Sequence, residues 1–206
     1  MTSLILSRRF FLEAALCGVA SALAVPAVAA PTQRVDAELN PDLLQRALTA
    51  LEQHRERIAH HDLIGIVDFS LPSHARRFHL MALRDGSVSS HLVAHGRGSD
   101  PAHTGWLQRF SNEPHSNATS SGAYVTGDRY VGAHGHSMRL DGLDATNCNA
   151  AARAIVIHSA WYVSEEMVRS RGALGRSQGC FAVSASSLQE IMERLGPGRL
   201  IYADKA

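Results

Sequence analysis

The sequence predicts a mainly β domain with a few helices, one of them at its N-terminal end. Short apolar runs with strand-like patterns outnumber helical patterns along the chain. Turn signals such as Asp85-Gly86 separate several of these runs, and about three segments carry helical patterns with capping residues. With 206 residues, of which 45% are hydrophobic, the chain is long enough to bury one sizeable core.

Residues 1–30 have the pattern of a twin-arginine signal peptide. Ser7-Arg8-Arg9-Phe10-Phe11-Leu12 precedes an apolar stretch from Ala14 to Val25, and Ala27-Val28-Ala29 has the A-x-A form of a cleavage site. The apolar stretch is short for a permanent membrane span. We therefore expect export by the twin-arginine route to the periplasm or cell envelope, no stable membrane span after cleavage, and one domain over residues 31–206.

The charge balance of residues 31–206 bears on the class of partner. Residues 31–206 contain equal numbers of basic and acidic residues, because residues 1–30 hold Arg8, Arg9 and Glu13. Neutrality argues against nucleic acid or an anionic membrane as the main partner. We expect no cofactor and a monomer. The twin-arginine route carries proteins folded in the reducing cytosol, so we expect no disulfide: Cys148 is predicted to be a plain buried thiol and Cys180 a free one.

The first predicted elements are a helix and an antiparallel meander. Asn40-Pro41-Asp42 has the pattern of a helix start, with a capping residue, a proline and an acid in the first turn. The apolar stripe that follows comprises Leu43, Leu44, Ala47, Leu48, Leu51 and Ile58. Strands are predicted at residues 63–69, 77–83 and 88–93, with Asp85-Gly86 as a hairpin turn.

The second half of the sequence begins with a long polar loop over residues 94–121, and such a loop is more often functional than decorative. Strand-like pieces are predicted at residues 123–126, 130–131 and 137–140. A buried strand at 154–157 delivers His158 at its end. Ser164-Glu165-Glu166 caps a short helix, residues 184–195 form an amphipathic helix closed by Gly196, and residues 200–202 form a final strand.

A histidine and a cysteine carry the strongest chemical signal. His158 precedes Cys180 by 22 positions, and Gly179 removes a side chain just before the sulfur. A cysteine nucleophile needs a nearby base, because a free thiol is mostly protonated at neutral pH, with a pKa of about 8.5. The glycine lets substrate and backbone N–H groups approach the reacting carbon. A buried structural cysteine beside a strand histidine is the simpler alternative.

Several segments together resemble the L,D-transpeptidase (YkuD-type) catalytic domain, in the branch of the murein L,D-transpeptidase catalytic domain family. They are residues 67–70 (Val-Asp-Phe-Ser), 93–99 (Val-Ala-His-Gly-Arg-Gly-Ser), 110–114 (Phe-Ser-Asn-Glu-Pro), 140–143 (Leu-Asp-Gly-Leu), 155–158 (Ile-Val-Ile-His) and 174–180 (Leu-Gly-Arg-Ser-Gln-Gly-Cys). The resemblance runs from about residue 40 to the C-terminus. It implies a β-sandwich or mixed sheets with an N-terminal helix.

The resemblance also implies an activity on peptidoglycan stem peptides. The cysteine, here Cys180, takes the acyl group as a thioester, and an amine of a second stem then forms a cross-link. His158 is implied to be the base, oriented by the carbonyl of Ser159. The N–H groups of Gly179 and Cys180 are the expected oxyanion donors.

Three positions depart from the family pattern. Gln178 stands where the wider family has histidine, and Phe181 where the closer branch has proline. The wider family also has a basic or polar residue soon after the cysteine, where this chain has Phe181 and Ala182. A stem peptide carries carboxylates, which need a cation or several N–H donors when they are desolvated.

Six residues are candidates for the substrate groove. Arg176 and Arg139 are the candidate cations, and we prefer Arg176 because it lies in the cysteine motif. His134 and His95 precede glycines in polar loops and are candidate groove residues. Ser177 and Gln178 flank the nucleophile, and Ser177 is expected to shape the turn.

Two alternatives remain at this point. An L,D-carboxypeptidase would use water as the acceptor on the same substrate. A periplasmic histidine-rich metal-binding protein would use some of the 12 histidines, among them His134-Gly135-His136. The histidines are scattered, however, and we predict no metal site.

Overall fold

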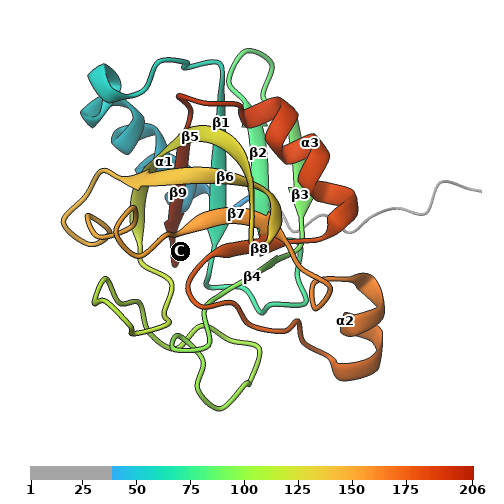
Figure 1. Ribbon diagram of the computed structural model, residues 1–206. Helices are drawn as coiled ribbons and strands as arrows, with labels where there is room; N and C mark the ends of the chain where they lie inside the picture. Colours follow the sequence, from blue (N-terminus) through green and yellow to red (C-terminus); the bar gives the residue numbers. More distant parts are fainter. Residues whose placement is uncertain (1–38) are drawn as a thin grey trace, which may run out of the picture. The chain divides into compact units, whose positions relative to one another are not determined.

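The computed structural model describes residues 39–206 (Figure 1). The predicted signal peptide lies outside these residues. The described part is mainly β, as predicted: a nine-stranded mixed sheet with three α-helices. The strand order is β3-β2-β1-β9-β5-β6-β7-β8-β4. None of the described helices is both long and apolar enough to cross a membrane.

Helix α1 (Pro41–Gln53) begins where the capping pattern predicts. The Asn40 side chain accepts hydrogen bonds from the N–H groups of Asp42 and Leu43, at 2.9 and 3.2 Å. Its buried residues, Leu43, Ala47, Ala50 and Leu51, form one cluster with Ile64 and Ile66 of β1 and Leu200 of β9. Ile58 is buried in the same cluster but lies beyond the helix, after a 3-10 turn at Arg55–Arg57.

The predicted meander is present. Strand β1 (Leu63–Asp68) pairs antiparallel with β2 (Phe78–Ala82), which pairs antiparallel with β3 (Val88–His91). On its other side β1 pairs parallel with the last strand, β9 (Leu200–Asp204). This parallel pair places the first and the last strand of the described chain side by side inside the sheet.

The third predicted strand is in fact two strands. Residues 88–93 were expected to be continuous, but the chain turns at Leu92, and β4 (Val93–Ala94) pairs with β8 (Phe181–Val183) instead of β2. Leu92 is buried in an apolar cluster with Val163 and Leu174, and this burial accounts for the turn. The two outermost strands of the sheet are therefore consecutive in the sequence.

The predicted short pieces at 123–126 and 130–131 are one long strand. Strand β5 (Gly122–Gly132) forms a hairpin with β6 (Gly135–Gly142), and the register shifts between Thr126 and Arg129. Such a bulge interrupts the side-chain alternation, so the pattern of one strand looks like two. The turn of this hairpin contains His134.

Two parallel strands follow the hairpin in the sheet. Strand β7 (Val156–Ser159) contains His158 as its third residue instead of ending before it, and it pairs parallel with β8. β8 was not predicted, because only three residues separate Cys180 from the next capping residue, Ser184. Helices α2 (Glu165–Arg171) and α3 (Ala185–Leu195) start at the caps Ser164 and Ser184, and α3 ends at Gly196 as expected.

The sheet crosses over itself, and its two parts share one core. Strands β6 and β7 run across β1 and β2 in Figure 1. Phe78 and Leu80 of β2 belong to the same buried cluster as Ile157 of β7 and Phe181 of β8. The rings of Tyr124 and Phe181 meet edge to face at 5.4 Å. This core fixes the ends of β7 and β8, where His158 and Cys180 lie.

Candidate active site

The residues before Cys180 form a tight turn that a serine and a glycine define. The Ser177 hydroxyl donates to the Cys180 carbonyl at 2.7 Å and accepts from the Gly179 N–H at 3.1 Å. Gly179 has φ of +116°, and a Cβ there would stand 2.7 Å from the Ala118 carbonyl oxygen. Only glycine fits this position. Ser177 thus shapes the turn, while the Gly179 N–H, an expected oxyanion donor, is already bonded to the serine.

The long polar loop holds this turn in place. The Arg97 N–H donates to the Ser177 carbonyl at 2.8 Å, and the Ser177 N–H donates to the His95 carbonyl at 2.9 Å. The Gly96 N–H donates to the Thr119 hydroxyl at 2.9 Å. A Cβ on Gly96 would overlap the Asn117 carbonyl oxygen and lie 2.9 Å from the Gly179 nitrogen. The loop therefore supports the turn before Cys180 through backbone contacts that leave no room for a side chain.

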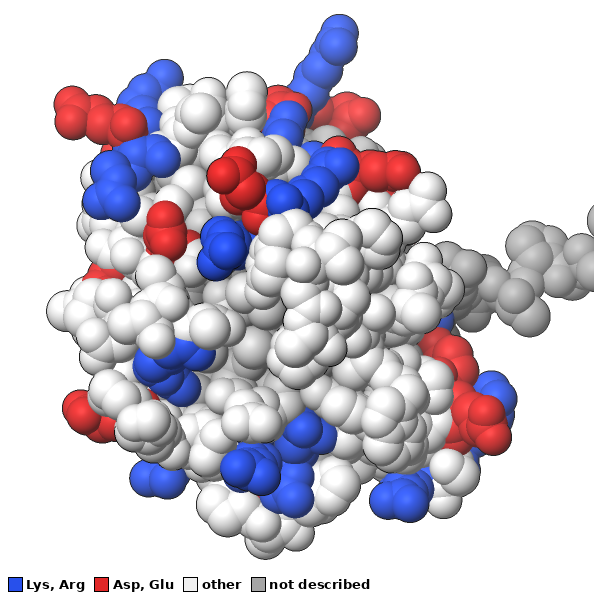
Figure 2. Space-filling view, viewed as in Figure 1, with Lys and Arg blue, Asp and Glu red and all other residues white. Residues whose placement is uncertain are grey.

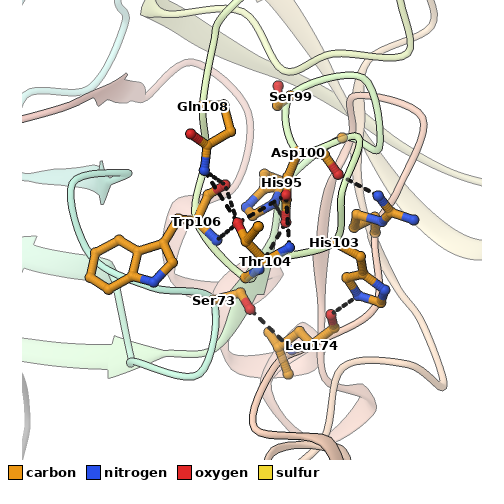
Figure 3. Close-up of polar contacts among 12 residues, drawn as sticks. Ser73, His95, Ser99, Asp100, His103, Thr104, Trp106, Gln108 and Leu174 are labelled. Atoms are coloured by element: carbon orange, nitrogen blue, oxygen red, sulfur yellow. Dashed lines mark hydrogen bonds and ion pairs between the residues drawn. The ribbon is translucent and has the colours of Figure 1, made fainter.

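The loop contains a polar network, with His95 and Asp100 fully buried (Figure 3). The Asp100 carboxylate accepts from the N–H groups of Thr104 and Gly105, at 2.9 and 2.8 Å, and bonds the His95 Nε2 at 3.4 Å. Arg77, which is fully buried, donates to the His95 Nδ1 at 2.8 Å. Since an arginine only donates, Nδ1 must accept and Nε2 must carry the proton toward Asp100.

His95 therefore packs inside the domain instead of lining a groove. It is 1% exposed, and both ring nitrogens are bonded. Burial, with the charge of Arg77, lowers its pKa to about 3, against the opposing effect of Asp100. The sequence pattern did not reveal this, because Arg77 and Asp100 approach His95 from distant segments.

His158 is oriented by the residue that follows it. Its Nδ1 bonds the Ser159 carbonyl oxygen at 2.9 Å. A carbonyl only accepts, so Nδ1 carries the proton and Nε2 is left as the acceptor. This is the orientation that a general base requires, and it is the contact expected for Ser159.

The strand register brings His158 and Cys180 to the same side of the sheet. His158 pairs with Ala182, and Ile157 pairs with Phe181. If the same register is extended by one residue, Cys180 lies opposite Val156. Alternate residues of a strand point to one face. The spacing of parallel strands places the His158 and Cys180 Cα atoms roughly 8 Å apart on a diagonal, within reach of a long side chain.

Burial keeps the Cys180 thiol and the His158 imidazole uncharged in the resting protein. It raises the pKa of the Cys180 thiol, against the opposing effects of the Val156 N–H and the Arg153 charge. Burial also lowers the pKa of His158, and the charge of His134 adds to this, while the Ser159 carbonyl opposes it. A thiol with a raised pKa beside an imidazole with a lowered pKa favours the uncharged pair, so the proton moves only when a reaction draws it.

His134 packs directly on the candidate base. The rings of His134 and His158 are stacked, with centroids 4.4 Å apart and planes 21° apart. His134 itself is exposed, at the turn of the β5–β6 hairpin. The structure thus brings this predicted residue to the site. Its neighbour His136 lines a hollow beside α3, which Ser159 also lines.

The two cysteines of the described chain differ in exposure. Both are free, and Cys180 is 8% exposed. Cys148 is exposed, so the prediction of a buried thiol was wrong. It lies in the turns after β6, where its sulfur contacts the Asn112 amide at 3.2 Å and the Ala145 carbonyl at 3.5 Å.

Neither predicted cation faces the cysteine turn. Arg176 donates to the carbonyls of Asp100 and Pro101, the latter at 3.1 Å. Arg139 is exposed on β6, where its guanidinium lies 4.5 Å from the centre of the Tyr130 ring. Gln178 is exposed and lines a hollow of about 280 Å³ together with Arg153.

Sequence reasoning missed two residues near the thiol. The charge of Arg153 acts on Cys180, as noted above. Burial raises the pKa of Tyr162 to about 12, with a smaller contribution from Cys180. Arg153 and Tyr162 both lie outside the 174–180 motif, so only the folded structure shows that they are near Cys180. In the described part of the chain, no three His, Cys, Asp or Glu side chains gather in a way that could hold a metal ion.

Comparison with known families gives one match. The model of the L,D-transpeptidase catalytic domain matches residues 35–203. No curated protein matches the chain.

Solved structures of L,D-transpeptidases are similar to the chain at low identity. One from Mycobacterium tuberculosis H37Rv is 14% identical, with a TM-score of 0.43, over 70% of this chain and 58% of that chain. One from Mycobacterium smegmatis is 16% identical, with a TM-score of 0.41, over 69% and 58%. L,D-transpeptidase 3 from Mycobacterium tuberculosis, in complex with a faropenem-derived adduct, is 14% identical, with a TM-score of 0.43, over 70% and 60%. The chain spans less than two thirds of the length of each.

Proposed function

The chain belongs to the L,D-transpeptidase catalytic domain family, and from this premise we propose that it cross-links peptidoglycan stem peptides through a thioester on Cys180. One observation carries the proposal. The His158 ring, held by the Ser159 carbonyl, keeps Nε2 as an acceptor on the side of the sheet where Cys180 lies. A thiol and an oriented imidazole are the two groups that thiol acyl transfer needs.

In the first half-reaction the thiol attacks the carbonyl carbon that follows the L-centre of the donor stem. His158 Nε2 takes the thiol proton as the S–C bond forms. The tetrahedral intermediate then collapses, the C–N bond to the D-residue breaks, and the imidazolium gives the proton to the leaving amine. The products are a thioester on Cys180 and a free D-amino acid.

In the second half-reaction an amine of another stem attacks the thioester. His158 accepts the proton of the amine as the new C–N bond forms, and the S–C bond breaks. The departing sulfur takes the proton back from the imidazolium. The enzyme returns to its neutral pair, and the donor and acceptor stems are joined.

A mass measurement tests the nucleophile. Wild type and Cys180→Ala are incubated with a purified disaccharide tetrapeptide or with a carbapenem, and the protein mass is recorded. We expect an acyl adduct on wild type that maps to Cys180, and none on Cys180→Ala. Because Cys148 is exposed, Cys148→Ser serves as the matched control and should keep the adduct. An adduct on Cys180→Ala, or one that maps to Cys148, would overturn the assignment.

The same incubation identifies the acceptor. With a second stem present, a cross-linked dimer is the expected product, with the mass of two stems minus one D-amino acid. Hydrolysis to a tripeptide with no dimer at any acceptor concentration would show that the L,D-carboxypeptidase alternative is correct.

We also propose that the chain acts in the periplasm after twin-arginine export. The Arg8-Arg9 pair, followed by Phe10-Phe11-Leu12, supports this route. Replacing both arginines by lysine should leave the precursor in the cytoplasm. Normal processing of that variant would indicate the general secretory route instead.

A further inference from the structure

The site described so far has a thiol and a base but no assigned group for a negative charge on the substrate. Stem peptides carry carboxylates, and a desolvated carboxylate needs charge-assisted hydrogen bonds. Arg176 and Arg139 point elsewhere. Arg153 is the remaining arginine with an electrostatic effect on Cys180.

The contacts of Arg153 fix its guanidinium between two segments. Its Nη1 donates to the Ser111 carbonyl at 2.8 Å, and its Nη2 donates to the Ser116 hydroxyl at 3.3 Å and to the Ala118 carbonyl. A Cβ built on Gly179 would lie 3.1 Å from this Nη2, so the guanidinium lies against the nucleophile turn. The side chain is thus held in place before any ligand binds.

Arg153 keeps both charge and donors to spare. A guanidinium has five N–H donors, and the three contacts above use three of them. Among the ion pairs of residues 39–206, none includes Arg153. Its partners are neutral oxygens, so its charge is not compensated by a carboxylate of the protein.

A hollow opens beside this guanidinium. It has a volume of about 280 Å³, and its lining residues are Pro114, His115, Asn117, Ala152, Arg153 and Gln178. No acidic residue is among them. Asn117 and Gln178 add side-chain amide donors. In Figure 2 the middle of the visible face is mostly uncharged, and charged side chains lie around it.

We propose that this hollow binds a carboxylate of the acyl donor and that Arg153 is its anion-binding residue. The inference rests on the proposed function and specifies where its donor is held. Gln178 lines the hollow, and the guanidinium lies against Gly179. The Cys180 Sγ contacts the carbonyl of Ala154, the residue after Arg153, at 3.6 Å. The hollow therefore lies next to the segments that hold the thiol. Arg153 thus supplies a cation from outside the cysteine motif, whereas Phe181 and Ala182, directly after Cys180, carry no charge.

The experiment compares two donors in two proteins. Acyl-adduct formation is followed by mass spectrometry with a stem tetrapeptide whose carboxylates are free and with the same peptide fully amidated. In wild type the free acid should react faster, by about 10- to 100-fold in kcat/KM, as expected for a charge-assisted hydrogen bond. In Arg153→Gln this preference should fall to nearly one.

The decisive readout is the ratio of kcat/KM for the free-acid peptide to kcat/KM for the amidated peptide. Arg153 also acts on the thiol, so Arg153→Gln should slow both donors, but that effect cancels in the ratio. Arg139→Gln is the matched control and should keep the wild-type preference. Arg153→Lys keeps the positive charge and should retain part of the preference for the free-acid peptide. If Arg153→Gln fails to fold, the wild-type preference and the Arg153→Lys variant still test the proposal.

The outcomes separate this inference from the proposed function. Adducts that form at equal rates with both donors in wild type would overturn the carboxylate site and leave the thioester mechanism standing. If Arg176→Gln loses the preference for the free-acid peptide and Arg153→Gln keeps it, Arg176 is the carboxylate-binding residue and the assignment to Arg153 is wrong. No adduct with either donor would overturn both proposals.

Discussion

The rings of His134 and His158 are stacked, with centroids 4.4 Å apart. His134 lies in the exposed turn of the β5–β6 hairpin and His158 in the inner strand β7, so an exposed ring packs on the buried candidate base. Two effects follow from it. The stack limits rotation of the His158 ring, and the charge of a protonated His134 opposes a second proton on His158.

Replacing His134 should change the pH profile of acyl-adduct formation. In His134→Ala the pKa of His158 should rise, because both the neighbouring charge and part of the burial are lost. Since the base must be neutral, the acidic limb of kcat/KM should move to higher pH. His134→Phe keeps the stacked ring but removes the charge. It should therefore move the acidic limb of kcat/KM to higher pH while preserving the rate at high pH. His136→Ala is the control, and an acidic limb that stays in place in His134→Ala would refute the coupling.

Replacing His158 should reduce turnover without unfolding the protein. We expect His158→Gln to lower kcat by about 10²–10⁴-fold, the usual effect of losing general acid–base catalysis. The side chain is 4% exposed and glutamine is of similar size, so thermal unfolding gives a check on structure. Full activity with an unchanged melting temperature would remove His158 from the mechanism.

The two free thiols should react at different rates with a small neutral alkylating reagent. Burial raises the pKa of Cys180, and the side chain is 8% exposed, whereas Cys148 is exposed. Near neutral pH we therefore expect Cys148 to be labelled first, as shown by peptide mapping after short exposure. Faster labelling of Cys180 would indicate a thiolate–imidazolium pair at rest, contrary to the neutral pair described above.

A methyl group on Gly96 should disturb the turn that precedes Cys180. Gly96→Ala places a Cβ into the Asn117 carbonyl and against Gly179, so we expect a destabilisation of about 1–3 kcal/mol and slower adduct formation. Gly86→Ala is the control. Its φ is +71° but nothing lies within 4 Å of the new Cβ, so it should cost about 1 kcal/mol and leave adduct formation unchanged. Urea unfolding and adduct kinetics measure the two effects, and a fully active Gly96→Ala would show that the turn is not constrained there.

His95 should make the fold sensitive to acid. Its pKa is about 3 in the folded protein and about 6.5 when unfolded, so the unfolded state binds the extra proton between these values. The free energy of unfolding is highest above pH 6.5 and falls as the pH drops toward 3, by on the order of 5 kcal/mol. His95→Gln should be less stable at pH 7 but should flatten the slope of unfolding free energy against pH in this range. His60→Gln, at an exposed position, should keep the wild-type slope.

Local signals in the sequence predicted the parts of the fold that depend on local interactions. The Asn40 cap and the meander each involve residues close in the chain or a short repeating pattern. The contact between His158 and the Ser159 carbonyl is also local, but the family resemblance implied it and the residue pattern alone did not. The same holds for Ser177, whose hydroxyl bonds Gly179 and Cys180 within one turn.

The features that the sequence did not reveal depend on distant segments. The role of Arg153 arises because it reaches a loop about 40 residues earlier in the chain, and nothing in its neighbours indicates that contact. Burial of His95 requires Arg77 and Asp100. The division of residues 88–93 depends on Leu92 meeting Val163 and Leu174. In each case the sequence showed the residue type, but its partner was set by tertiary packing.

The position of Leu92 also bears on how the protein meets other molecules. It joins β3 to β4, which are the two ends of the nine-stranded sheet and have only four and two residues. Unpaired strand edges are where foreign strands add and aggregation begins. Here both edges are short and adjacent along the chain, so an incoming strand has little length to pair with. The nine-stranded sheet can thus resist the addition of foreign strands through its short edge strands, without charged residues along each edge.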